Sequence, residues 1–388
     1  MTKFTFNQPF NYSINSSRII KINNKSIENV LSQRREEGRL ISKITPVNEK
    51  KKDKKVDDMT LILGINRLFI FKANGKLEED HHFLDIVEIQ SPNSNEITIK
   101  FRNNNSAKFN STDTDKILKT LYTSFVTTFP AITIGKALIF SVLPETRLVT
   151  IFQSVSNLTK ESGPCGSFAI TYKSICDYVG ISPLSSVVWD IENLYPFNSI
   201  REFNLNEIYQ SNANDVKALI MAMAYNNYFT SFVASNCKLS TDETNQLTET
   251  LKVNTTLQKI LLNNIQSSKE SIMSVLGALT DNKAIKLQHI NIGNNILESK
   301  GIVALGSTIQ SFATGITHIN VESCQTSGKP LESLFNSILA SSSIGTLQFL
   351  SINNNKLELC QFVACPTEWR RSQSAVLTGN RASKVSER

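Results

Sequence analysis

Cysteine, proline, glycine and tryptophan are all scarce in this chain of 388 residues, which has 6 Cys, 10 Pro, 15 Gly and 2 Trp. So few glycines and prolines exclude a collagen-like repeat and a low-complexity chain. No run of 18 apolar residues occurs, and the opening MTKFTFNQPF lacks a basic segment followed by an apolar one. The sequence therefore predicts neither a transmembrane helix nor a secretory signal, and we expect a cytosolic protein of two or three domains.

None of the cysteines forms a CxxC pair, which argues against a disulfide framework and against a zinc ribbon. We expect reduced, buried thiols instead. Their positions are Cys165, Cys176, Cys237, Cys324, Cys360 and Cys365.

Positive charge is concentrated in the first third of the chain. Residues 1–130 hold 21 Lys and Arg against 15 Asp and Glu, whereas residues 131–388 hold 20 against 19. The densest basic run, residues 50–55, predicts weak and reversible binding to anionic phospholipid, because each basic residue contributes at most about 1 kcal/mol. A solvated loop without a ligand stays open as the alternative, and nucleic acid is not expected, because no aromatic residues interleave the lysines. The predicted lipid-binding residues are Lys43, Lys50, Lys51, Lys52, Lys54 and Lys55.

Short runs of β-type residues occupy residues 39–110. In one of them Ile97, Ile99 and Phe101 alternate with polar residues, which is the period of a half-buried strand. Turn residues separate the runs, and Glu78–Asp80 with His81 and His82 are predicted to be an acidic loop. The predicted strands are Arg39–Thr45, Thr60–Leu63, Arg67–Lys72, Phe83–Ile89, Glu96–Arg102 and Ala107–Asn110.

An amphipathic helix is predicted after these strands, because Ile117, Leu121 and Phe125 recur every four residues. Thr112 and Asp115 have the spacing of a capping box at its start. Six or seven strands closed by one helix are the order of a pleckstrin-homology (PH) domain. That resemblance implies that the lysine run, between the first two strands, meets phosphoinositide headgroups. The predicted second strand carries no basic pair, so we expect a diffuse electrostatic contact.

The C-terminal half of the chain repeats itself. Leu287-x-x-Ile290-x-Ile292-x-x-Asn295-x-Leu297 is a full leucine-rich repeat (LRR) string, and a second full string begins at Leu347. Weaker copies begin at Ile200, Phe229, Leu257 and Ile316, and the spacings of 28 to 31 residues are typical of long, helix-containing repeats. One strand and one helix cannot bury their apolar face alone, so we expect the units to stack into a right-handed, horseshoe-shaped solenoid.

The concave face of such a solenoid is a surface for an unidentified protein partner. His289 and His318 occupy equivalent positions on it, but two imidazoles without a third ligand make a poor metal site, so neither a metal nor a cofactor is predicted. The predicted outward positions are Glu202, Asn204, Ser231, Val233, Lys259, Leu261, His289, Asn291, His318, Asn320, Phe349 and Ser351.

Catalytic motifs are missing from the sequence. We find no nucleophile elbow, phosphate loop or HExxH. Some helix-containing LRR proteins activate GTPases, a role that calls for a catalytic arginine or an acidic cluster at the solenoid edge, and residues 200–357 contain a single arginine, Arg201. We therefore predict no catalytic residues.

Residues 131–199 fit neither the repeat nor a linker, and we expect a helical connector that caps the first repeat and fixes the first domain against it. Four strings, GPCGSFAITYKSICDYVGI, VVWDIENLY, YNNYFTSF and CKLSTDE, resemble the N-terminal region of the CARMIL family, scaffolds that link capping protein, the actin-branching complex and myosin-I. The resemblance covers residues 36–357. It implies a cytosolic protein, recruited to the plasma membrane, that regulates actin assembly in protrusions, macropinocytosis and migration.

The chain also departs from the family pattern. Members carry more repeats, a helical dimerisation domain and a basic, Pro-rich tail, whereas here about six repeats are followed by an atypical end. Capping protein and myosin-I are partners expected of the family, but no capping-protein motif and no PxxP occurs in this chain. We expect a truncated form whose residues 358–388 are disordered.

The predicted fold class is α/β plus β: a PH-like β barrel with a C-terminal helix, then a helical connector and a right-handed LRR solenoid. The predicted domains are a polar extension (1–35), the PH-like domain (36–130), the connector (131–199), the repeats (200–357) and the tail (358–388). The predicted function is a non-enzymatic, membrane-associated scaffold of the actin cytoskeleton at the cell cortex. Two alternatives stay open, an LRR adaptor that does not bind lipid and a GTPase activator.

Overall fold

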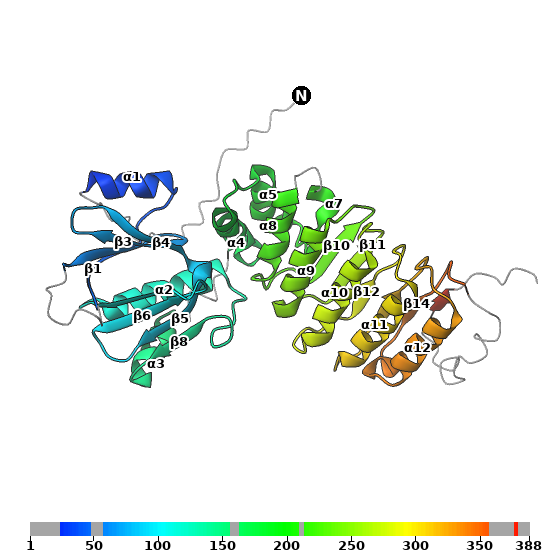
Figure 1. Ribbon diagram of the computed structural model, residues 1–388. Coiled ribbons are helices and arrows are strands. Elements are labelled where there is room, and N and C mark those ends of the chain that lie inside the picture. The colour runs from blue at the N-terminus through cyan, green and yellow to red at the C-terminus, as the bar shows by residue number, and fades with distance from the viewer. Residues whose placement is uncertain (1–23, 48–56, 156–162, 209–212, 357–375, 379–388) are drawn as a thin grey trace, which may run out of the picture. The chain divides into compact units, whose positions relative to one another are not determined.

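The computed structural model describes residues 24–47, 57–155, 163–208, 213–356 and 376–378 (Figure 1). The chain divides into two compact units, residues 1–163 and 164–388, and each has its own sheet and its own apolar core. Within the described ranges, no helix is both long and apolar enough to cross a bilayer.

The sheet of the first unit has the strand order β4-β3-β2-β1-β7-β6-β5-β8 in the part of the chain that the structure describes. Neighbouring strands are antiparallel, except that β8 runs parallel to β5. Five of the six predicted strands agree with the structure to within one residue at each end. The strands are β1 (Leu40–Pro46), β2 (Met59–Leu63), β3 (Arg67–Lys72), β4 (Leu77–His82), β5 (Ile86–Ser91), β6 (Glu96–Phe101), β7 (Ser106–Asn110) and β8 (Ile139–Val142).

The predicted acidic loop is wrong, because these residues form the edge strand β4. Its charges are neutralised by residues that are distant in the sequence: Asp80 Oδ1 lies 2.6 Å from Arg67 Nε on β3, and Asp80 Oδ2 lies 2.9 Å from Arg34 Nη2. The His81 ring stacks on Phe101, with the centroids 3.7 Å apart. The predicted strand Phe83–Ile89 begins too early, because Phe83–Asp85 form a 3-10 turn before β5.

Two helices cover the sheet of the first unit. Helix α1 (Lys25–Gln33) begins at Asn24, whose side chain accepts from Ser26 N and Ile27 N, and it lies within the predicted N-terminal extension. Its apolar face nevertheless joins the core of the unit, where Ile27 and Leu31 cluster with Ile62, Phe69 and Phe71. The predicted N-terminal extension, residues 1–35, therefore includes a helix that packs on the sheet of the first unit.

Helix α2 (Thr114–Thr128) is the predicted closing helix, and Ile117, Leu121 and Phe125 are buried along one side of it. The predicted capping box is wrong. The helix begins at Asp113 without a side-chain cap, and Ser111 organises the turn instead: its Oγ accepts from Asp113 N, and its carbonyl accepts from Thr114 Oγ1.

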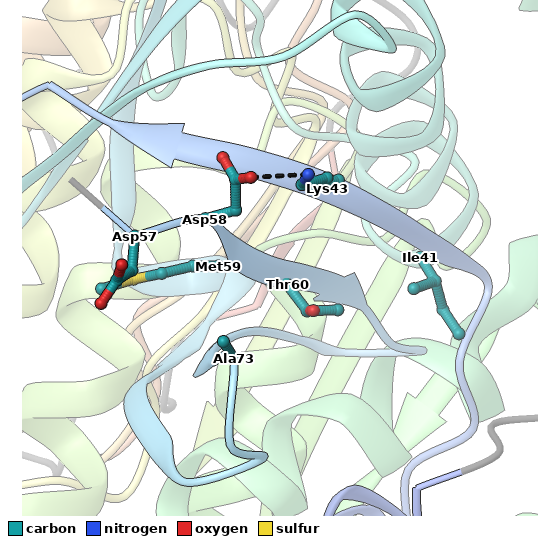
Figure 2. Close-up of a pocket in the computed structure, with 7 residues that line it drawn as sticks. All are labelled: Ile41, Lys43, Asp57, Asp58, Met59, Thr60 and Ala73. Carbon is teal, nitrogen blue, oxygen red and sulfur yellow. Dashed lines mark ion pairs between the residues drawn. The ribbon is translucent and has the colours of Figure 1, made fainter. Parts of the chain in front are cut away.

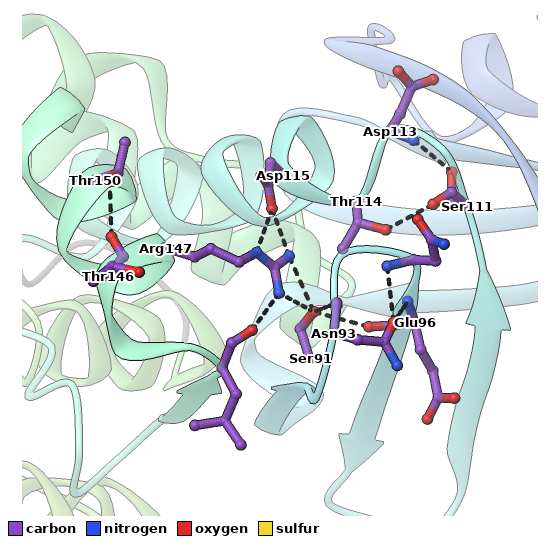
Figure 3. Close-up of polar contacts among 12 residues, drawn as sticks. Ser91, Asn93, Glu96, Ser111, Asp113, Thr114, Asp115, Thr146, Arg147 and Thr150 are labelled. Atoms are coloured by element: carbon purple, nitrogen blue, oxygen red, sulfur yellow. Dashed lines mark hydrogen bonds and ion pairs between the residues drawn. The ribbon is translucent and has the colours of Figure 1, made fainter.

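The first part of the predicted connector belongs to the first unit. Strand β8 extends the sheet beside β5, and helix α3 (Glu145–Val155) packs on α2, where Phe152 stacks on Tyr122 at 4.4 Å. Figure 3 shows the polar anchor of this segment: Arg147 donates to Asp115 Oδ1 through Nε (3.1 Å) and Nη2 (2.5 Å), and to Leu143 O through Nη1. A single helical connector over residues 131–199 is therefore the wrong description.

The second unit is a parallel β/α solenoid, and the described helices lie side by side along one side of the strands (Figure 1). The strands are β9 (Glu202–Asn204), β10 (Ser231–Ser235), β11 (Lys259–Asn263), β12 (His289–Asn291), β13 (His318–Asn320), β14 (Phe349–Ser351) and β15 (Val376–Thr378). The helices are α7 (Leu205–Ile208), α8 (Ala213–Met223), α9 (Thr241–Val253), α10 (Lys269–Asp281), α11 (Glu298–Ser311) and α12 (Gly328–Leu339), with a 3-10 turn at Ser342–Gly345.

The LRR pattern explains this architecture. The second residue of each strand from β9 to β14 points into the core and is at most 1% exposed, whether it is Phe203, Ile290 or Leu350. After the strand, Asn295 occupies the asparagine position of the LRR pattern. Its amide donates to Leu262 O and Ile292 O. Cys324 holds the same position in the next repeat and donates to Ile292 O at 3.4 Å. The predicted stacking of six repeats is confirmed by the parallel pairing of all six strands.

The four cysteines in the described residues are free and buried, as predicted, whereas Cys360 and Cys365 lie outside the described part. Burial raises the pKa of Cys165 and of Cys176 to about 11. These thiols therefore stay protonated near neutral pH and are poor nucleophiles.

Disorder throughout residues 358–388 is also a wrong prediction, because Val376–Thr378 form β15. This strand pairs in parallel with β14, with Leu377 opposite Leu350. β15 pairs with backbone groups at the edge of β14. No LRR string in the sequence predicts this strand. The other residues of the predicted tail lie outside the described part.

The rest of the predicted connector covers the first repeat. It comprises α4 (Pro164–Val179), α5 (Ser185–Trp189), the π-helical turn η2 (Asp190–Leu194) and α6 (Tyr195–Phe197). Phe168 of α4 packs against Phe203 and Phe229 of the first two repeats, at centroid distances of 5.2 and 5.3 Å. These rings seal the apolar end of the solenoid.

Candidate binding surfaces

The predicted concave residues form two columns across the parallel strands, and every predicted position lies in one of them. Strand pairing aligns the first and the third residue of each strand from repeat to repeat. The first column is Glu202, Ser231, Lys259, His289, His318 and Phe349, and the second is Asn204, Val233, Leu261, Asn291, Asn320 and Ser351.

Three members of these columns offer little surface to a partner. Ser231, Val233 and Ser351 are only 4%, 7% and 2% exposed. The two serines bond to longer side chains of the adjacent repeats: Ser231 Oγ donates to Glu202 Oε2, and Ser351 Oγ donates to Glu322 Oε2. The strand register does not predict this burial. It fixes which way a side chain points, but not whether longer side chains of neighbouring repeats cover it.

Three rings stack along the first column. The centroids of His289 and His318 are 5.0 Å apart, and those of His318 and Phe349 are 5.9 Å apart, with the planes tilted by 33° and 26°. Burial, followed by the charges of His318 and Lys259, lowers the pKa of His289 to about 4. His289 is therefore neutral at pH 7. Together the rings give the concave face an aromatic centre with Lys259 at one end.

We expect the solenoid to lose stability as the pH falls from about 6.5 to about 4. The unfolded chain protonates His289 near its ordinary pKa of about 6.5, whereas the folded chain resists protonation until about pH 4. Across this window the unfolded state binds more protons, so acid favours unfolding. The midpoint of urea denaturation, measured between pH 7 and 4, should show a smaller loss in His289→Gln than in the wild type. An equal loss in both proteins would contradict the assignment of this pH dependence to His289.

A pocket of about 540 Å³ opens beside β1 and β2 in the first unit, and Figure 2 shows its lining. Lys43 of β1 points across to Asp58, with 2.5 Å between Nζ and Oδ2, and Asp57 stands beside them. Lys43 is thus a lipid-binding candidate whose charge is already compensated. Asp57 and Asp58 stand just after the lysine run in the sequence, but nothing in the sequence shows that Asp58 pairs with Lys43. The lining residues are Ile41, Lys43, Asp57, Asp58, Met59, Thr60 and Ala73.

The remaining predicted lipid-binding residues, Lys50, Lys51, Lys52, Lys54 and Lys55, lie outside the described residues. The described strands β1 and β2 flank them, so the lysine run connects the first two strands as predicted. Within the described residues, no group of three His, Cys, Asp or Glu side chains could hold a metal ion.

An antiparallel sheet closed by a helix, followed by a parallel LRR solenoid with an open concave face, defines a two-module binding protein. Residues 41–130 match the Carmil pleckstrin homology domain, and residues 165–367 match the LRR domain of the CARMIL family. The chain therefore belongs to the CARMIL family, which confirms the resemblance seen in the sequence.

Three curated relatives share this region. The Rho GTPase-activating protein gacW of Dictyostelium discoideum is 48% identical over 89% of this chain and 31% of its own length. Protein CARMIL of the same organism is 32% identical over 90% of this chain and 34% of its own length. Capping protein, Arp2/3 and myosin-I linker protein 3 of Mus musculus is 25% identical over 78% and 22%, respectively. The chain thus spans about a third or less of the relatives that it matches.

Proposed function

We propose that this chain is a membrane-proximal, non-enzymatic scaffold of the actin cortex. The PH-like unit binds anionic phospholipid weakly, and the concave LRR face binds a protein that takes part in regulating actin filament assembly. The observation that carries the proposal is the CARMIL-family PH and LRR arrangement, with two aligned columns of side chains open on the solenoid. This role would place the chain in the cytoplasm, at the inner face of the plasma membrane.

The lipid contact depends on the lysine run. The described pocket brings one lysine and two carboxylates, and Lys43 is paired with Asp58, so the pocket by itself does not attract an anionic headgroup. The five lysines of residues 50–55 supply the attraction, at about 1 kcal/mol each at most. Such binding is diffuse, and added salt screens it.

Changing Lys50, Lys51, Lys52, Lys54 and Lys55 to Gln should abolish sedimentation of the chain with vesicles of phosphatidylserine and phosphatidylcholine. A matched variant with Gln at five solenoid lysines, Lys252, Lys269, Lys283, Lys286 and Lys300, should retain binding. Asp57→Asn should strengthen binding slightly, because it removes a carboxylate beside the run.

Two results would sink the lipid role: unchanged binding in the loop variant, or an equal loss in both lysine sets. Either result would favour the adaptor that does not bind lipid. Insensitivity of the wild-type binding to salt would contradict a diffuse electrostatic contact.

A second candidate is the targeting region of a Rho GTPase regulator, which the 48% identity to gacW favours. In that case the chain would position a GTPase-activating region without supplying the chemistry. The single arginine of the repeats supports this division: the Arg201 guanidinium lies 3.8 Å over the Tyr228 ring and donates to Tyr228 O, so it is engaged within the fold. A catalytic arginine must instead reach the transferring phosphate.

A further inference from the structure

The cap of the solenoid presents large apolar side chains to solvent. They belong to the continuous helical segment 185–197, made of α5, η2 and α6. Phe197 is 87% exposed, Trp189 58% and Leu194 42%. We call these three residues the Trp189 patch. Contiguous exposed apolar surface marks interaction sites, whereas apolar residues exposed singly are common.

The segment cannot turn the patch inward, because its opposite side is already anchored. Val187, Ile191 and Tyr195 follow one another at intervals of four and are at most 4% exposed. The Tyr195 ring meets Phe229 edge-on at 6.0 Å, and its hydroxyl donates to Glu207 Oε2. The patch is therefore held rigidly before any partner arrives, which lowers the entropy lost on binding.

The two asparagine side chains next to the patch bond to the backbone of the same segment. Asn193 lies between Trp189 and Phe197 in the sequence, but its Nδ2 donates back to Trp189 O at 2.8 Å. Asn198 Nδ2 likewise donates to Leu194 O at 3.0 Å. Both amides thus satisfy carbonyls of the π-helical turn and its flank. Such turns are frequent at functional sites.

The helical segment that carries the patch is acidic. No lysine or arginine occurs from residue 181 to 200, although the whole chain carries a net charge of +7. The segment itself bears Asp190 and Glu192. Glu192 pairs with Lys173 of α4 at 2.9 Å, which leaves the Asp190 carboxylate as the excess charge next to the rings.

We propose that the Trp189 patch docks a basic amphipathic helix of a partner protein. The apolar face of that helix packs on Trp189, Leu194 and Phe197, and its lysines or arginines lie beside Asp190 and Glu192. This site is separate from the concave columns and goes beyond the proposed function. Since an aromatic side chain offers about 150–250 Å², the two rings expose at least about 200 Å², which suits the central anchor of an interface rather than a whole one.

Charge complementarity selects this occupant over two others. An anionic membrane would be repelled by the carboxylates beside the rings, and a second copy of the patch would bring like charges together. A basic helix supplies both the apolar surface and the opposite charge.

The full chain with Trp369→Phe leaves Trp189 as the sole tryptophan, so its fluorescence reports on the patch directly. The probes are two synthetic 18-residue helices with leucine at the same apolar positions, one with lysine and one with glutamate elsewhere. We expect saturable binding of the lysine helix with a blue shift of Trp189 emission, and at least tenfold weaker binding of the glutamate helix. Phe197→Ser should weaken binding of the lysine helix at least tenfold, and Asp190→Asn with Glu192→Gln should remove most of the preference for it.

Ile296→Ser is the matched control, since Ile296 is 53% exposed on another part of the solenoid and its loss should leave binding unchanged. Circular dichroism checks that each variant is folded. Equal binding of both helices, or full binding by Phe197→Ser, would overturn the proposal. Self-association in sedimentation velocity that Phe197→Ser abolishes would assign the patch to a second copy. A blue shift with phosphatidylserine vesicles that Phe197→Ser abolishes would assign it to a membrane, and either result overturns the basic helix.

Discussion

Phe229→Ala should lower the free energy of unfolding of the second unit by about 3–5 kcal/mol. The ring is completely buried and sits among rings from both the cap and the first repeat: Phe168 at 5.3 Å, Phe203 at 5.3 Å and Tyr195 at 6.0 Å. These neighbours come from elements that are anchored elsewhere, so they cannot collapse into the space. Truncation thus leaves a cavity as well as losing apolar burial.

Urea denaturation of the full chain with Trp369→Phe, followed by circular dichroism and by Trp189 fluorescence, measures this loss. The matched control is Phe197→Ala, which removes the same atoms from a side chain that is 87% exposed and should change stability by no more than about 0.5 kcal/mol. Equal effects of the two substitutions would show that the cap does not pack on the first repeat through Phe229.

Asn295→Ala should cost about 3–5 kcal/mol, because it leaves several buried backbone groups without a partner. The Asn295 amide donates to Leu262 O at 2.6 Å and to Ile292 O at 2.9 Å, and its Oδ1 accepts from Ile265 N at 3.0 Å. The side chain is only 4% exposed, so water cannot replace these bonds without opening the repeat. The loss should appear in the same denaturation experiment, as a transition at lower urea.

Two further variants make this prediction specific. Asn295→Cys should cost less than Asn295→Ala, because Cys324 occupies the equivalent position and donates to a carbonyl of the neighbouring repeat. Asn245→Ala, at an exposed position of α9, should change stability by no more than about 0.5 kcal/mol. If Cys proved no better than Ala, the donor role of this position would be refuted.

The repeats and most strands of the first unit could be predicted because their signals are local. Ile97, Ile99 and Phe101 alternate within one strand, and the LRR string fixes which residues of β12 and β14 point inward. The same spacing placed His289 and His318 side by side, and the structure confirms this at 5.0 Å.

The failures at β4 and β8 share one cause, which is that the deciding partners lie far away in the sequence. The β4 sequence predicts a loop because three acidic residues follow one another there. In the structure Arg34 and Arg67 neutralise Asp80. β8 reads as part of a connector until it pairs with β5. Similarly, the burial of Val233 depends on neighbouring strands.

The Trp189 patch was missed for a related reason. Trp189, Leu194 and Phe197 are interspersed with the buried Val187, Ile191 and Tyr195, so the sequence does not show which of these apolar residues are covered. Only the packing of α4 and the first repeat decides which side is covered.

The in-register pairing of β9 to β14 places equivalent side chains of the concave face at regular intervals, one per repeat. Each repeat advances both columns by one interstrand distance, about 4.8 Å, and nothing in a parallel ladder forces it to close as a barrel must. Deleting or duplicating one whole unit would therefore shift a bound ligand's contacts by a fixed step while leaving the chemistry of the other rungs intact. The number of repeats therefore sets the length of the binding surface, and the side chain at each column position sets its selectivity.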